Sequence, residues 1–192
     1  TMTQCSYKGT VESSRTGELR IGGLVGCIDS ANTTISNCLN EGTVRSTGTS
    51  AAPNGIGGLV GYVSNTGSVG TKIENSLNIG PVTSAHATPS NKDSIIGYAN
   101  TAIINNLYST SVTDTTKAGF NQVLVDDIKG DTAKPTLSGF DFANTWLVRE
   151  NDTPILNLEN IVIRTSSAIQ PNNVIQMISR FISKGKKVGL MG

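Results

Sequence analysis

The sequence is poor in the residues on which most globular cores and enzyme sites depend. Aromatic residues make up 5% of its 192 residues, charged residues make up 15%, and His86 is the single histidine. A conventional globular core needs more large apolar side chains than this composition supplies. A stack of thin chain turns with small residues at its corners does not need them, so the composition favours a stack of this kind.

Several classes of function lack support in the sequence. The net charge of +1 gives no indication of nucleic acid or of an anionic membrane surface as a partner. No run of about 20 apolar residues is present, so this segment contains no predicted membrane span. Neither a Cys-x-x-Cys pair nor a His cluster occurs, and Gly22-Gly23 is not followed by the Gly-Lys-Ser/Thr of a phosphate loop. We therefore predict neither a metal nor a cofactor.

Two segments recur in the same order along the chain. Ile21-Gly-Gly-Leu-Val-Gly26 returns as Ile56-Gly-Gly-Leu-Val-Gly61 and, in weakened form, as Ser94-Ile-Ile-Gly97. Aligned on their last glycines, these copies are 35 and 36 residues apart. The second segment, residues 35–44, returns at residues 73–82, and partial copies begin at Met2 and Ile104. Segments that repeat at a near-constant step indicate a repeat array.

Each repeat is expected to contain three short strands. These are the Gly-Gly-Leu-Val-Gly run, the Ile-x-Asn-Cys-Leu-Asn run, and a strand at the positions of Val11, Val44 and Val82. The strands keep one order, and no Asn-Gly or Asp-Gly two-residue turn joins them, so pairing between repeats is favoured over hairpins. The predicted fold is all-β: a right-handed parallel β-helix, or solenoid, of about three to four repeats.

The chain is predicted to have three parts. Residues 1–115 carry the repeats, residues 116–165 form a cap, and residues 166–192 form an amphipathic tail in which 171–183 has helical spacing. The last turn of a solenoid exposes unpaired backbone and needs such a cap. The predicted apolar anchors of the cap are Phe140, Phe142, Trp146 and Leu156.

Stacked repeats place equivalent residues next to one another. We expect Ile35, Ile73 and Ile104 to form one buried column, and a second column to contain Cys5, Cys38 and Ser76. The Cα atoms of Cys5 and Cys38 would lie about 4.8 Å apart, within reach of a disulfide. A ladder of small buried side chains is the alternative that we favour, and Cys27 is then a free thiol. The glycines predicted to be structural, because stacking leaves no room for a Cβ atom, are Gly22, Gly23, Gly26, Gly57, Gly58, Gly61 and Gly97.

Strict alternation of side chains makes the Gly-Gly-Leu-Val-Gly strands apolar on both faces. One face would carry Leu24, Leu59 and Ile95. A strand that is apolar on both faces is normally covered on both. We therefore expect the outward face to be covered by residues 171–183 or to dock a partner. This candidate docking stripe consists of Val25, Val60, Ile96, Cys27, Tyr62 and Tyr98.

The repeated motifs also resemble a known family. Gly-Gly-Leu-Val-Gly followed by Ile-x-Asn-Cys-x-Asn-x-Gly-x-Val is similar to the GLUG repeat, over about residues 1–112. The segment from Gly139 to Leu156, with Phe-Asp-Phe, Trp and Pro-x-Leu, looks like the one that closes many GLUG arrays. The resemblance implies a β-solenoid scaffold in secreted or surface-attached proteins, including non-catalytic regions of some bacterial IgA-cleaving proteases and adhesin-like proteins. It supplies no catalytic residues.

Carbohydrate-active β-helix enzymes are a further alternative, because glycosidic cleavage commonly uses paired carboxylates. Here the carboxylates do not align between repeats: Glu41 aligns with Lys8 and Ile79, and Glu74 aligns with Ser36. We predict no enzyme, and this alternative is the least favoured of three. We also expect Asp126-Asp127 to be a solvated turn.

The favoured function is a non-enzymatic scaffold or binding module of a secreted or cell-surface, adhesin-like protein. The glycosylation sequon Asn32-Thr-Thr34 supports it only in a eukaryotic secretory setting. Its expected partner is a protein or an upstream part of the same chain, since Thr1 aligns with Thr34, with glycans as a second class of ligand. The alternative is a structural subunit of a larger, intracellular assembly, which unpaired cysteines favour.

Overall fold

The computed structural model describes residues 1–48, 55–64, 69–85, 91–99, 102–113 and 117–157, together with the backbone of residues 162–164 and 189–191. The chain divides into two compact units, Thr1–Leu156 and Asn157–Gly192. Within the described residues, no helix is long and apolar enough to cross a membrane. In the second unit, β19 (Val162–Arg164) pairs in parallel with β20 (Gly189–Met191). The predicted helix at 171–183 lies outside the described residues.

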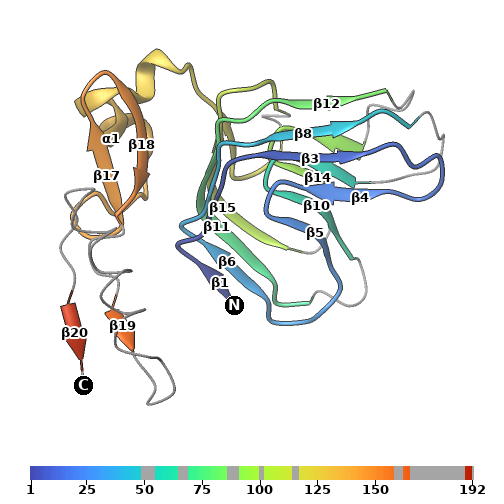
Figure 1. Cartoon of the computed structure of the whole chain (residues 1–192), viewed down its shortest axis with the longest axis horizontal. Helices are drawn as coiled ribbons and strands as arrows, with labels where there is room; N and C mark the ends of the chain where they lie inside the picture. Colours follow the sequence, from blue (N-terminus) through green and yellow to red (C-terminus); the bar gives the residue numbers. More distant parts are fainter. Residues whose placement is uncertain are drawn as a thin grey trace, which may run out of the picture. The chain divides into compact units, whose positions relative to one another are not determined.

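Short strands from successive repeats pair in parallel in four sheets of the first unit, and Figure 1 shows strands such as β3, β8 and β12 side by side. The fold is therefore all-β, as predicted. The largest sheet contains β1 (Met2–Thr3), β2 (Ser6–Tyr7), β6 (Thr34–Ser36), β7 (Leu39–Asn40), β11 (Lys72–Asn78), β15 (Ile103–Ser109) and β16 (Phe120–Gln122). The three smaller sheets are β3 (Thr10–Ser13), β8 (Thr43–Ser46) and β12 (Val82–Ser84); β4 (Arg20–Gly22), β9 (Gly55–Gly57) and β13 (Lys92–Asp93); and β5 (Val25–Ile28), β10 (Val60–Val63) and β14 (Ile96–Tyr98).

The pairing register confirms that equivalent residues stack. Ile73 pairs with Ile35 on one side and with Ile104 on the other. Ile35 and Ile73 are buried, and Ile104 is half-buried against the same core. Each repeat therefore adds one layer to a continuous apolar column, which is how short strands with few large side chains bury a core.

Asparagines form one corner of each layer after the first, as their tolerance of positive φ predicts. Asn37, Asn75 and Asn106 have φ values of 52°, 48° and 50°, and Gln4 at the equivalent position has 51°. In each case the next residue returns to the core-facing row that contains Cys38 and its equivalents. The corner thus turns the chain without interrupting the stacking.

The Gly-Gly-Leu-Val-Gly runs differ from their predicted form, because each run contains two strands. A bend at Gly58-Leu59 separates β9 from β10, so strict alternation does not continue across it. Leu59 and Val60 both lie in the main core cluster with 0% of their surface exposed, as does Ile96 in the third repeat. The prediction that Val60 and Ile96 face outward is therefore wrong, and Val25, which is half-buried, also packs against this core.

A different apolar row lies on the opposite side of the strands from the main core. Leu39 pairs with Leu77, and Leu77 pairs with Tyr108. All three are buried, although they alternate with core residues such as Leu107. The Tyr108 ring meets the Phe140 ring edge-on at 5.5 Å between centroids. The segment after the repeats therefore covers this outer row at Tyr108.

The covering segment follows β16 and contains η2 (Asp126–Ile128), η3 (Gly130–Thr132), α1 (Ala133–Thr136) and an antiparallel hairpin of β17 (Trp146–Arg149) and β18 (Asp152–Leu156). Of the predicted anchors, Phe140, Trp146 and Leu156 are buried and Phe142 is half-buried. The Phe140 and Trp146 rings stack with their centroids 4.4 Å apart. The Tyr108 hydroxyl donates a hydrogen bond to the Ser138 carbonyl at 3.0 Å, which fastens this segment to β15.

Candidate binding surface

The half-buried part of the predicted docking stripe is a row of stacked groups. Tyr62 pairs with Cys27 on one side and with Tyr98 on the other. The two tyrosine rings are nearly parallel, at 10°, with their centroids 5.0 Å apart. On the other side of Tyr62, the guanidinium carbon of Arg20 lies 4.5 Å from the ring centroid. We call Arg20, Cys27, Tyr62 and Tyr98 the tyrosine row.

Arg20 is held in place by two neighbours of the first repeat. It donates a hydrogen bond to the Cys27 sulfur at 3.5 Å and forms an ion pair with Glu18. The hydrogen bonds from Arg20 to Cys27 and to Glu18 raise the pKa of the guanidinium, which stays charged. Because Arg20 and Tyr98 cover the two faces of the Tyr62 ring, only the edge of this ring is left for other contacts. The row is suited to polar and edge-on contacts, and it contains no acid–base pair.

The repeat glycines lie where one layer of backbone packs on the next. A Cβ atom on Gly23 would lie 2.3 Å from the carbonyl oxygen of Gly58, and one on Gly58 would lie 2.1 Å from that of Ser94. Both separations are far below van der Waals contact, and backbone atoms cannot move aside cheaply. Backbone of an adjacent layer lies similarly close at Gly22, Gly57, Gly61 and Gly97, whereas a Cβ atom on Gly26 would meet the Arg20 carbonyl oxygen of its own repeat at 2.8 Å.

The third repeat has Asp93 and Ser94 in place of the glycine pair, and both side chains form hydrogen bonds. The Asp93 carboxylate accepts hydrogen bonds from the Thr113 hydroxyl at 2.6 Å and from the Ile95 backbone N–H at 2.7 Å. The Ser94 hydroxyl donates to the carbonyl of Ser111 at 3.3 Å. We call Asp93, Ser94, Ser111 and Thr113 the end latch. The loss of both glycines in the third copy was the sequence signal for it.

A hollow of about 570 Å³ lies beside the end latch. Asp93 is the single carboxylate in its lining, and Lys92 and Gln122 are among the other polar residues. Paired carboxylates for glycosidic cleavage are thus not brought together there. Among the described residues, no group of three or more His, Cys, Asp or Glu side chains is arranged to hold a metal ion.

A buried amide ladder, which the sequence analysis missed, also crosses the layers. The Asn40 side-chain amide donates to the Asn78 side-chain oxygen at 2.7 Å, and the Asn78 amide donates to the Ser109 hydroxyl at 3.5 Å. Each amide also bonds the chain two residues on: Asn40 donates to the Gly42 carbonyl at 3.0 Å, and Asn78 to the Gly80 carbonyl at 2.8 Å. Buried amides that are satisfied in this way fix the register of the stack.

The three thiols are all free. Cys38 is completely buried, and burial raises its pKa to about 11. Cys5 and Cys27 are half-buried. The column of Cys5, Cys38 and Ser76 is therefore present as small side chains without a disulfide, and the thiol of Cys38 remains protonated at neutral pH.

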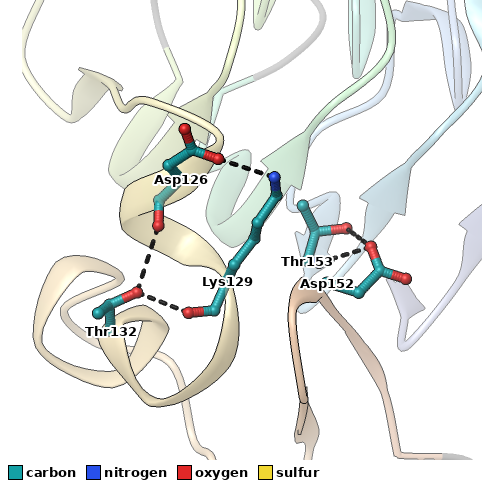
Figure 2. Close-up of polar contacts among 5 residues, drawn as sticks. All are labelled: Asp126, Lys129, Thr132, Asp152 and Thr153. Atoms are coloured by element: carbon teal, nitrogen blue, oxygen red, sulfur yellow. Dashed lines mark hydrogen bonds and ion pairs between the residues drawn. The ribbon is translucent and has the colours of Figure 1, made fainter.

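The polar groups of the covering segment close its own turns, as Figure 2 shows. The Lys129 ammonium lies 2.7 Å from the Asp126 carboxylate, and the Thr132 hydroxyl donates to the Lys129 carbonyl at 2.6 Å. Asp152 accepts a hydrogen bond from the Thr153 backbone N–H at 2.8 Å. Asp126 is exposed. These contacts are local, and none of them forms a site.

The chain matched no family model, no curated protein and no solved structure.

Proposed function

We propose that the chain is a right-handed parallel β-helix of about three to four GLUG-like repeats that serves as a non-enzymatic scaffold. Its partner is a protein, or a glycan, at the tyrosine row. The proposed setting is a secreted or cell-surface, adhesin-like protein, as the resemblance of the repeat motifs implies.

The observation that carries the proposal is that the repeated residues contact the equivalent residues of neighbouring layers. Ile73 has an isoleucine neighbour on both sides, and Asn40 bonds Asn78. At the repeat glycines, neighbouring backbone fills the space that a Cβ atom would need. Repeats of this kind build an extended, rigid support, which is what a scaffold requires.

The tyrosine row supports binding by position and chemistry. Tyr62 and Tyr98 are half-buried and stacked across layers, and Arg20 adds a fixed positive charge beside them. Tyrosine and arginine are among the side chains enriched at protein interfaces, because each combines an apolar body with hydrogen-bonding groups.

Binding can be tested with the purified chain against immobilised glycans and host cell-surface proteins by biolayer interferometry. We expect Arg20→Gln to weaken binding about tenfold, a typical effect of removing an interface arginine. Arg45→Gln is the matched control, because Arg45 is also exposed and ion-paired, with Glu12 at 2.5 Å, but lies on another sheet. Equal binding by both variants would show that the tyrosine row is not the binding surface. Release of reducing sugars from a polysaccharide panel would contradict a non-enzymatic role.

The alternative, a structural subunit of an intracellular assembly, has one observation in its favour. All three cysteines are free, whereas oxidising compartments usually pair cysteines. Fractionation of the producing cells would separate the two settings, since the alternative expects the protein inside the cell and bound to a larger complex.

A further inference from the structure

The pairing of β1 with β6 and of β2 with β7 places Cys5 and Cys38 directly opposite one another in adjacent layers. Thr3 pairs with Ser36 before them, and Ser6 pairs with Leu39 after them. The Leu39 N–H donates to the Cys5 carbonyl at 2.9 Å, so the two layers remain bonded between these pairs. Adjacent parallel strands hold opposed Cα atoms about 4.8 Å apart, within the range that disulfides span.

The two sulfurs also point the same way. The Cys5 thiol donates to the Thr3 carbonyl at 3.3 Å, and the Cys38 thiol donates to the Ser36 carbonyl at 3.2 Å, so each bonds the residue two places earlier. Cys38 is a buried member of the main core cluster, and Cys5 packs against the same cluster. In the third layer Ser76 makes the same bond, to the Glu74 carbonyl at 2.9 Å. The row therefore contains two oxidisable groups in adjacent layers, followed by a hydroxyl in the third layer.

We propose that Cys5 and Cys38 form an intrachain disulfide between the first two repeats when a disulfide oxidant such as oxidised glutathione is supplied. This inference is independent of the proposed binding function. It identifies one specific pair, because Cys27 lies on β5 in a different sheet, where it accepts a hydrogen bond from Arg20.

The exposure of the two thiols sets the order of the reaction. Cys5 is half-buried, whereas Cys38 has 0% of its surface exposed. The Cys5 thiolate attacks one sulfur of oxidised glutathione, and the first glutathione leaves as a thiolate. Cys38 then loses its proton, and its sulfur attacks the Cys5 sulfur and displaces the second glutathione. The two cysteines lose two protons and two electrons in all, and the oxidant yields two molecules of reduced glutathione.

The test uses the full 192-residue chain with Cys27→Ser, so that Cys5 and Cys38 are the only thiols. The folded protein is equilibrated with oxidised glutathione, unfolded in the presence of an alkylating agent, and mapped by mass spectrometry. We expect a linked peptide that contains Cys5 and Cys38, and a melting temperature about 5 °C or more above that of the reduced protein.

Two single substitutions separate the steps. With Cys38→Ser we expect glutathione to stay attached to Cys5, because no second thiol displaces it. With Cys5→Ser, which copies the residue at Ser76, we expect the buried Cys38 to remain alkylatable and without glutathione. The proposal is overturned if Cys5 and Cys38 are both alkylated after oxidation, or if the Cys27→Ser chain keeps glutathione on Cys5 instead of forming the link. It is also overturned if the link between Cys5 and Cys38 forms in the unfolded chain but not in the folded chain.

Discussion

The second and third repeats differ at the two positions where the first two repeats have a glycine pair. In the second, Gly57 and Gly58 leave space that the backbone of the next layer fills. In the third, Asp93 and Ser94 occupy these positions and bind Thr113 and Ser111 through their side chains. A glycine is therefore required where another strand of the same sheet packs on the motif, and a hydrogen-bonding side chain takes its place where none follows. The change of the motif in the third copy coincides with β13 and β14, the last described strands of their two sheets.

The largest expected effect comes from adding one methyl group to the second repeat. Gly58→Ala places a Cβ atom 2.1 Å from the Ser94 carbonyl oxygen, and we expect the free energy of unfolding to fall by about 3 kcal/mol. Gly17→Ala is the matched control, because its Cβ atom would meet only the Arg15 side chain, at 3.5 Å. Urea unfolding of both variants makes the comparison. A change below about 0.5 kcal/mol at Gly58 would show that the layers are not packed this closely.

The amide ladder should contribute somewhat less. Asn78→Ala removes the acceptor of the buried Asn40 amide and leaves the Gly80 carbonyl without its donor. A buried polar group left unsatisfied costs about 1–3 kcal/mol, so we expect a loss of about 2 kcal/mol in thermal or urea unfolding. Asn105→Ala, at an exposed position of β15, serves as the control and should be nearly neutral. Equal effects would mean that the ladder does not hold the layers.

A smaller effect is expected at the end latch. Thr113→Val keeps the shape of the side chain and removes its 2.6 Å hydrogen bond to Asp93. We expect a loss of about 1–2 kcal/mol, since the acceptor is a buried carboxyl group. Thr83→Val, at an exposed position of β12, is the control. Unchanged hydrogen exchange in β14 and β15 of Thr113→Val would show that the end latch does not stabilise these strands.

The smallest effect should be a pH dependence outside the repeats. Hydrogen bonds, first that from the Asn144 side chain, lower the pKa of Asp141 in the folded chain. The stabilisation is complete above the unfolded pKa of about 3.9 and is lost as pH falls through the lower folded value. Asp141→Asn should therefore flatten the melting temperature against pH below about pH 4. An unchanged slope would mean that Asp141 makes no contribution to acid unfolding.

The sequence predicted the stacking well, because stacking depends on residues that recur. The register of Ile35, Ile73 and Ile104 and the asparagine corners both follow from the repeat alignment. The facing of Val60 and Ile96 was mispredicted, because a bend after Gly58 resets the alternation and period-two reasoning assumes a continuous strand. The row of Leu39, Leu77 and Tyr108 went unnoticed because the segment that covers it is distant in the sequence.

The residues of the candidate binding surface were harder to predict for a related reason. Tyr62 and Tyr98 were identified from their alignment, but the contact of Arg20 with the Tyr62 ring depends on a strand, β4, that the sequence analysis had merged with its neighbour. The end latch depends on Thr113, which lies beyond the last copy of the glycine motif. Long-range partners of this kind leave no local signal in one sequence.

The central claim is that successive repeats stack in parallel and in register. A crystal structure of the chain measures this directly through the Cα atoms of residues 35, 73 and 104. The account predicts that consecutive members of this column lie about 4.8 Å apart and that their strands run in the same direction. Separations above about 7 Å, or antiparallel pairing between these strands, would contradict it.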